Sequence, residues 1–250
     1  MSRNYELMQK FENSTASEAR RHPPGSLFAS AKKAVRETET EDLSTDEALQ
    51  LVQRVFLQQA GDPPHVVVFA GINHGDGCSR ISVAVAETLV KNVRGSVCLV
   101  EANFRTPSLP DMFGTTNHFG LTNAILSDDP IRTYAKPVRK AANLWLLSSG
   151  ALKSNSASLL SSERLKERLK ELRSEFEFVI IDAPPLTQYG DAMAIGQLTD
   201  GIVLILEAGA TRREAAQAVT ADLRTSKIPI LGAVLNKRTF PIPEHIYKRL

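Results

Sequence analysis

The sequence predicts an α/β fold in which a mostly parallel, doubly wound sheet is covered by helices on both faces. Short apolar segments of strand length alternate along the chain with longer segments that have helical periodicity. The apolar segments lack the polar and apolar alternation of a strand with one face in water, so both faces of the sheet should be buried. Ligands bind such sheets beyond the carboxyl ends of the strands, and a site is expected there.

The composition limits the class of protein. The chain has 250 residues, of which 42% are hydrophobic, as expected for one globular domain with a short appendage. The net charge of +2 predicts no nucleic-acid partner. The polar N-terminus has no signal core, and no apolar run approaches the ~20 residues that span a bilayer. The cysteines, Cys78 and Cys98, indicate no disulfide framework. We expect a soluble, cytoplasmic protein.

The chain is expected to divide into an N-terminal appendage, residues 1–43, and a main domain, residues 44–250. Residues 1–12 have the apolar spacing of a short amphipathic helix, which could dock on another protein or stay solvated. Residues 13–42 have the polar composition of a flexible linker.

The main domain is predicted to begin with a helix that Ser44 or Thr45 caps and that runs to about residue 59. The predicted strands are residues 65–70, 96–100, 144–147, 178–181, 201–207 and 228–235. The later helices are expected at residues 81–93, 121–126, 159–175, 191–197 and 212–225. Parallel strands joined by helices bring their carboxyl ends to one edge of the sheet.

Residues 66–80 have the layout of a phosphate-binding loop, in which an apolar strand leads through a glycine-rich turn into a helix. The glycines of the turn are Gly71, Gly75 and Gly77. They would let the backbone wrap around phosphates, towards which the helix also directs its N-terminus. Ser79 stands where a magnesium ligand is expected, but Cys78 occupies the position of the lysine that reaches the outer phosphates.

Several alternatives apply to this loop. A glycine-rich turn can be a simple tight connection. Arg80 could replace the missing lysine, although a helical turn would direct its side chain elsewhere. Cys78 could be an inert small residue, or a redox-sensitive thiolate, because a helix N-terminus lowers the pKa of a thiol.

Polar residues also follow the other predicted strands at the same edge. Asp182 could hold Mg²⁺ through water or cap a turn. Glu101 could act as a general base or metal partner, whereas Asn103 could be a ligand or a turn residue. Arg105 could reach a phosphate or form a surface ion pair, and Asn236 ends the last strand. Their gathering at one edge predicts a site.

The order of these segments resembles that of the bacterial tyrosine kinases, cytosolic autokinases of capsule and exopolysaccharide export. The resemblance covers residues 44–250 and rests on residues 71–80, 101–107, 154–162, 179–185, 211–214 and 232–236, together with the tail at 241–247. It implies a P-loop NTPase fold of the deviant-Walker type that partition ATPases share. It also implies that ATP or ADP and Mg²⁺ are the cofactors.

The resemblance assigns roles to individual positions. Nucleotide contacts fall on Gly75, Asp76, Gly77, Cys78, Ser79, Arg80, Arg105 and Asn236, the last against adenine. The metal positions are Ser79 and Asp182, the catalytic positions are Asp182, Glu101 and Asn103, and the phospho-acceptor position is Tyr247. The implied partner is a membrane chain-length determinant, a polysaccharide co-polymerase, which would bring the chain to the inner face of the membrane. A second partner could be an active kinase paralogue.

The chain departs from the family pattern at its functional positions. Cys78 replaces the loop lysine, Glu101 and Asn103 replace two aspartates, Gln50 and Gln53 replace two assembly arginines, and Tyr247 stands where a tyrosine cluster is usual. These changes predict a catalytically degenerate regulatory partner with weak or no ATP turnover. One alternative is an active protein-tyrosine autokinase of the same pathway. A positioning ATPase is favoured least, because Asn73 stands at the position of its second loop lysine.

Overall fold

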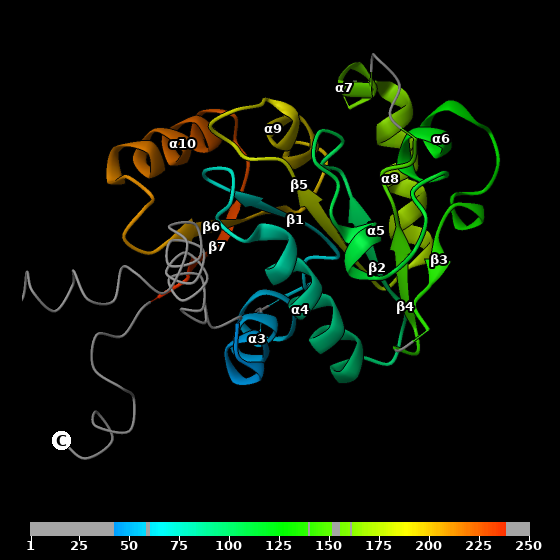
Figure 1. Ribbon diagram of the computed structural model, residues 1–250, viewed down its shortest axis with the longest axis horizontal. Helices are drawn as coiled ribbons and strands as arrows, with labels where there is room; N and C mark the ends of the chain where they lie inside the picture. The colour runs from blue at the N-terminus through cyan, green and yellow to red at the C-terminus, as the bar shows by residue number, and fades with distance from the viewer. Residues whose placement is uncertain (1–42, 59–60, 140, 152–155, 161, 239–250) are drawn as a thin grey trace, which may run out of the picture. The chain divides into compact units, whose positions relative to one another are not determined.

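The computed structural model in Figure 1 describes residues 43–58, 61–139, 141–151, 156–160 and 162–238. All of them lie in one compact unit, Glu41–Leu250. The predicted helix at 1–12, the linker at 13–42 and Tyr247 lie outside the described residues. The expected domain boundary therefore stays a prediction.

Seven strands form one sheet in the order β3-β4-β2-β5-β1-β6-β7. The strands are β1 (Val66–Gly71), β2 (Val97–Glu101), β3 (Lys136–Pro137), β4 (Leu144–Leu147), β5 (Phe178–Ala183), β6 (Gly201–Glu207) and β7 (Ile230–Asn236). Every neighbouring pair is parallel except β3 with β4, which is antiparallel. The predicted parallel sheet is confirmed. The sequence did not predict β3, because a two-residue strand has no periodicity to detect.

The helical segments cover both faces of this sheet (Figure 1). They are α3 (Thr45–Val52), η1 (Gln53–Leu57), α4 (Cys78–Asn92), α5 (Leu109–Met112), α6 (Leu121–Leu126), η2 (Ile131–Thr133), α7 (Ser156–Leu159), α8 (Glu163–Glu175), α9 (Asp191–Gly196) and α10 (Arg213–Thr225). Ser44 caps α3 in a reciprocal capping box with Glu47, as expected. The single helix predicted over 159–175 was wrong at its start, because Ser162 caps a separate helix there.

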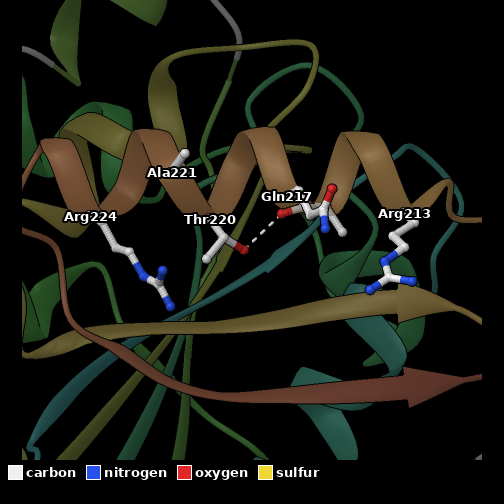
Figure 2. Close-up of a pocket in the computed structure, with 6 residues that line it drawn as sticks. Arg213, Gln217, Thr220, Ala221 and Arg224 are labelled. Carbon is white, nitrogen blue, oxygen red and sulfur yellow. Dashed lines mark hydrogen bonds between the residues drawn. The ribbon is translucent and has the colours of Figure 1, made fainter.

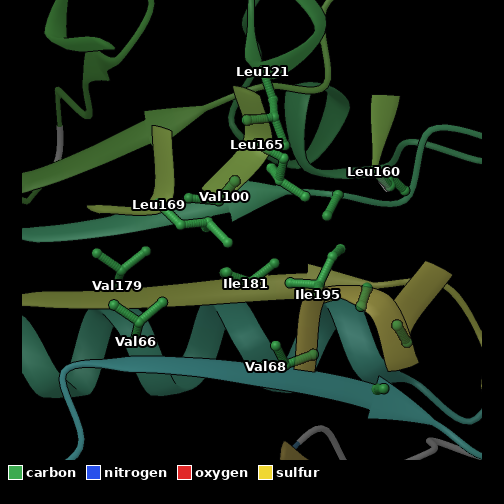
Figure 3. Close-up of a cluster of buried hydrophobic side chains, with 14 of the residues drawn as sticks. Val66, Val68, Val100, Leu121, Leu160, Leu165, Leu169, Val179, Ile181 and Ile195 are labelled. Atoms are coloured by element: carbon green, nitrogen blue, oxygen red, sulfur yellow. The ribbon is translucent and has the colours of Figure 1, made fainter. Parts of the chain in front are cut away.

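Two apolar clusters lie on the two faces of the sheet. Successive residues of β1 alternate between them, so that Val66 and Val68 join one cluster while Val67 and Phe69 join the other. Figure 3 shows the first cluster, where side chains of β1, β2 and β5 meet those of α8 and its neighbours. All six residues of β1 are buried, which confirms a sheet covered on both sides. The central strands thereby hold the carboxyl edge of the sheet in a fixed geometry.

The carboxyl edge brings together the loop after β1, Glu101 on β2, Asp182 on β5 and Asn236 on β7. Ser148 follows β4 at the same edge. In the described part of the chain, no helix has the length and apolar character needed to cross a membrane.

Candidate functional site

The loop between β1 and α4 folds back on itself. Gly75 and Gly77 have φ values of +90° and +88°, in the left-handed region that favours glycine. The buried Asp76 carboxylate accepts a hydrogen bond of 2.8 Å from the backbone N–H of Asn73, and burial raises the pKa of Asp76. The helix α4 begins at Cys78, earlier than predicted, and Gly77 has no side chain to cap it. Its first amides are therefore available to an anion.

Asp182 accepts hydrogen bonds from side chains of the first turns of α4. Ser79 Oγ donates to Oδ2 at 2.6 Å, and Ser82 Oγ donates to Oδ1 at 3.3 Å. The Cys78 thiol also hydrogen-bonds to this carboxylate. Burial raises the pKa of Asp182 to about 6, although these hydrogen bonds oppose the rise. The structure thus brings the predicted metal pair, Ser79 and Asp182, into direct contact.

Cys78 is partly buried at the start of α4. Desolvation of the thiol, followed by the charge of Asp182, raises the pKa of Cys78 well above its usual value. Both effects oppose the reactive-thiolate alternative and favour Cys78 as an inert small residue. Cys78 fills the lysine position as a neutral thiol.

Glu101 lies opposite Asp182 in the register between β2 and β5, and its side chain is fully buried. Its Oε2 accepts hydrogen bonds from the amides of Ser108 at 2.9 Å and Leu109 at 2.7 Å. Its Oε1 is buried without a hydrogen-bond partner. Burial, with a smaller contribution from the charge of Asp182, raises the pKa of Glu101 to about 8. At neutral pH this carboxyl is therefore mostly protonated.

Asn103 and Arg105 make contacts among nearby protein side chains. The Asn103 side chain donates to Thr106 Oγ1 at 3.0 Å and accepts from the Thr106 amide at 3.2 Å. This geometry corresponds to the turn interpretation of Asn103. The Arg105 guanidinium lies 3.5 Å from Asp191 Oδ2 and stacks 3.9 Å from the centre of the Tyr189 ring. It thus forms the ion pair that was one of its two interpretations.

Asn236 reaches the loop from the end of β7. Its Nδ2 donates to the carbonyl oxygen of Asp76 at 2.8 Å. The next residue, Lys237, forms an ion pair of 2.9 Å with Glu207 at the end of β6. Asn236 is therefore at the predicted edge and in contact with the predicted loop, but through a loop carbonyl that the sequence could not identify.

The sequence did not predict the polar cluster that lies at the end of β4. Ser148 and Ser149 are both buried, and Ser149 Oγ accepts a hydrogen bond of 2.9 Å from Asn117. Ser148 Oγ has no partner. Val100 of β2 pairs with Leu147 of β4, so Glu101, the last residue of β2, and Ser148, the residue after β4, follow that pair at the same edge of the sheet. The available signal was the polar run at 148–150 directly after an apolar strand.

The residues present fit a magnesium nucleotide in part. The Ser79 hydroxyl and the Asp182 carboxylate are oxygen donors, which Mg²⁺ prefers, and it commonly uses few protein ligands with phosphates and water. Within the described ranges, no three His, Cys, Asp or Glu side chains group as a metal centre. The left-handed glycines and the start of α4 suit a phosphate, whereas Cys78 lacks the positive charge of the usual lysine.

A pocket lies apart from these residues, along α10 (Figure 2). Its volume is about 440 Å³. It is lined by Arg213, Ala216, Gln217, Thr220, Ala221 and Arg224. None of them is a predicted site residue, so the candidate site stays at the carboxyl edge of the sheet.

Known proteins resemble this chain in sequence. No protein-family model matches it. The tyrosine-protein kinase YwqD of Bacillus subtilis is 27% identical over 205 residues, which cover 82% of this chain and 86% of YwqD. The tyrosine-protein kinase CpsD of Streptococcus pneumoniae serotype 4 is 25% identical over 181 residues, which cover 72% of this chain and 79% of CpsD.

Solved structures resemble the fold. The chimerical protein CapA2B2 gives a TM-score of 0.73 at 20% identity and covers 82% of this chain and 89% of its own. The VpsO kinase domain gives a TM-score of 0.70 at 24% identity and covers 78% of this chain and 96% of its own. A putative plasmid partition protein from Borrelia burgdorferi bound to AMPPNP gives a TM-score of 0.55 at 17% identity. The match covers 75% of this chain and 80% of that protein. The expected P-loop architecture is confirmed.

Proposed function

Since the chain is a relative of the bacterial tyrosine kinases, we propose that it is a regulatory partner in capsule or exopolysaccharide synthesis and export, with weak or no phosphoryl transfer. It binds a magnesium adenine nucleotide at the loop after β1. The observation that best supports weak or absent phosphoryl transfer is Cys78. It is a neutral thiol, hydrogen-bonded to Asp182, at the position where the family has the loop lysine.

The missing charge has a large expected effect on transfer. Removing one preorganised group that stabilises a transition state typically lowers a rate by about 10²–10³-fold. Glu101 adds a second, smaller deficit, because a carboxyl with a pKa of about 8 is mostly protonated at neutral pH, so only a minor fraction is in the ionised form that accepts a proton. Asn103 carries no charge and is engaged with Thr106. Little turnover is expected unless another chain supplies the missing groups.

Nucleotide binding is a separate matter from turnover. The unblocked start of α4 and the left-handed loop glycines can still contact phosphates through backbone amides. Ser79 and Asp182, in contact at 2.6 Å, offer oxygen ligands to Mg²⁺. Weak binding of ATP or ADP with magnesium is therefore compatible with an impaired transfer step.

The proposed partner is a membrane chain-length determinant, and an active kinase paralogue is the second. The family resemblance supports both. Through the first partner, the chain would lie at the cytoplasmic face of the membrane.

The test is a titration of the full chain with ATP and ADP, with and without Mg²⁺, combined with measurement of ATP loss and of phosphate on Tyr247. We expect binding that magnesium strengthens and an ATP loss no faster than that of the Asp182→Asn variant. Turnover well above that variant, or phosphate on Tyr247, would contradict the proposal and support the active autokinase. A repeat with the membrane partner present tests whether another chain completes the site.

A further inference from the structure

Asn236 connects two segments that are far apart in the sequence. It is the last residue of β7, and its Nδ2 donates to the carbonyl oxygen of Asp76 at 2.8 Å across a separation of 160 residues. Asp76 lies between Gly75 and Gly77, the two loop residues with left-handed backbones. This hydrogen bond therefore acts on the part of the loop between its two left-handed glycines.

The approach of Asn236 to the loop requires a glycine. A Cβ atom built on Gly77 would lie 2.3 Å from Asn236 Nδ2, closer than real contacts allow. Gly75 has nearly the same φ, +90° against +88°, but a Cβ built there meets nothing within 4 Å. A side chain at Gly77 would thus be opposed both by the backbone conformation and by Asn236. At Gly75 only the backbone conformation opposes it.

Asn236 is itself held by the sheet. Its carbonyl oxygen accepts a hydrogen bond of 2.9 Å from the Ala208 amide, and it pairs with Glu207 in the register between β6 and β7. Lys237 adds the 2.9 Å ion pair with Glu207 directly beside it. The side chain of Asn236 therefore projects from an anchored strand end.

The hydrogen bond also fixes the direction of an amide. The peptide unit between Asp76 and Gly77 is planar and trans, so its carbonyl oxygen and its N–H point in opposite directions. When Asn236 binds the Asp76 oxygen, the Gly77 N–H must point away from Asn236. Loop amides that point into the concave side are what holds a phosphate in loops of this kind.

We infer that Asn236 is a positioning residue that sets the phosphate-binding shape of the loop, so that its effect falls on the phosphates of a ligand and not on its base. The inference rests on the proposed nucleotide site and deepens it. One hydrogen bond between neutral groups corresponds to about a threefold to tenfold change in an equilibrium constant. Removal of the Asn236 amide should therefore weaken every polyphosphate ligand by a similar factor.

The first experiment compares Asn236→Ala with wild type in binding magnesium ATP and magnesium tripolyphosphate, which has no base. Both ligands should bind about threefold to tenfold more weakly. The matched control is Asn92→Ala, which also removes a 2.8 Å amide bond, to the Thr88 carbonyl, away from the loop. It should leave both affinities unchanged. A loss confined to ATP, with tripolyphosphate unaffected, would overturn the inference and identify Asn236 as a base contact.

The second experiment needs no ligand. Hydrogen exchange of the loop amides at residues 73–79 is measured for Gly75→Ala and Gly77→Ala, each with and without Asn236→Ala. Both glycine variants carry similar backbone strain, but only Gly77→Ala displaces Asn236. Exchange should rise more in Gly77→Ala, and this excess should vanish in the Asn236→Ala background. An excess that persists there overturns the inference. If wild type binds neither ligand, the proposed nucleotide binding fails, while this measurement still decides the role of Asn236.

Discussion

Glu101 and Asp182 lie opposite each other on the adjacent parallel strands β2 and β5, with both side chains buried. Residues paired in register project to the same face of a sheet, so the two carboxyl groups share one environment. Burial is the main cause that raises the pKa of Glu101 to about 8 and that of Asp182 to about 6. Near neutral pH, Glu101 keeps its proton while Asp182 is mostly ionised.

The raised pKa of Glu101 predicts how stability changes with pH. Between its ordinary value of 4.5 and about 8, the folded chain keeps a proton that the unfolded chain has lost. The free energy of unfolding therefore falls as pH rises through this window. Glu101→Gln removes the titration and can keep the bonds from Ser108 and Leu109. Relative to wild type, this variant should gain on the order of 3–4 kcal/mol between pH 5 and pH 8.

The measurement is urea unfolding at several pH values. Glu214→Gln is the control, because Glu214 is exposed on α10, and its curve should run parallel to wild type. If the Glu101→Gln curve also runs parallel to wild type, the buried carboxyl does not hold a proton in the folded state.

Cys78 should react slowly with alkylating reagents, because only the thiolate is nucleophilic and burial beside Asp182 raises the pKa of the thiol. Asp182→Asn removes the neighbouring charge but leaves the burial, so alkylation should become faster, by about tenfold for each unit by which the pKa falls. The measurement is iodoacetamide labelling at pH 7.5, followed by mass spectrometry. Cys98, which is fully buried in β2, is the internal reference and should not change. Rapid labelling of wild-type Cys78 would contradict the prediction.

Restoring the loop charge is the most direct test of the site. Cys78→Lys should bind magnesium ATP about tenfold or more tightly than wild type, because a positive charge then faces the phosphates. Cys78→Met is the matched control, since it fills a comparable space without charge. Equal affinities for the two variants, measured by calorimetry, would show that the missing charge does not limit binding. If affinity rises while ATP loss does not, Glu101 and Asn103 become the groups that limit transfer.

The edge of the sheet that carries these residues could be predicted, because buried parallel strands are apolar runs with a recognisable length. The strands at 144–147 and 201–207 have the predicted bounds. The short elements β3 and α5 were not predicted, since two or four residues are too few to show a repeating pattern of polar and apolar side chains. The apolar pattern of the sequence thus predicts the central strands of the sheet, whereas the short elements depend on the residues that pack around them.

The partners of the site residues were less predictable than their positions. Arg105 could be placed at the edge, but its choice of Asp191 and Tyr189 depends on a segment more than 80 residues later. Asn236 was expected near a ligand, and its bond to the Asp76 carbonyl is a contact with backbone, which has no residue-specific signal. The contacts of a side chain can be predicted from a sequence only when its partner is close in the chain.

Ser148 and Ser149 offer a final prediction, because they are adjacent, equally buried and different in hydrogen bonding. Ser149 Oγ is bonded to Asn117, whereas Ser148 Oγ has no partner. Ser149→Ala should lower the free energy of unfolding by about 1 kcal/mol, since it leaves the side-chain amide of Asn117 without its hydrogen-bond partner. Ser148→Ala removes a hydroxyl that costs free energy to bury, so it should be neutral or stabilise by up to about 1 kcal/mol. Urea unfolding of both variants decides between these outcomes. Equal destabilisation by the two changes would mean that Ser148 has a partner in solution, with a water bridging to the unpartnered Glu101 Oε1 as the first structure to look for.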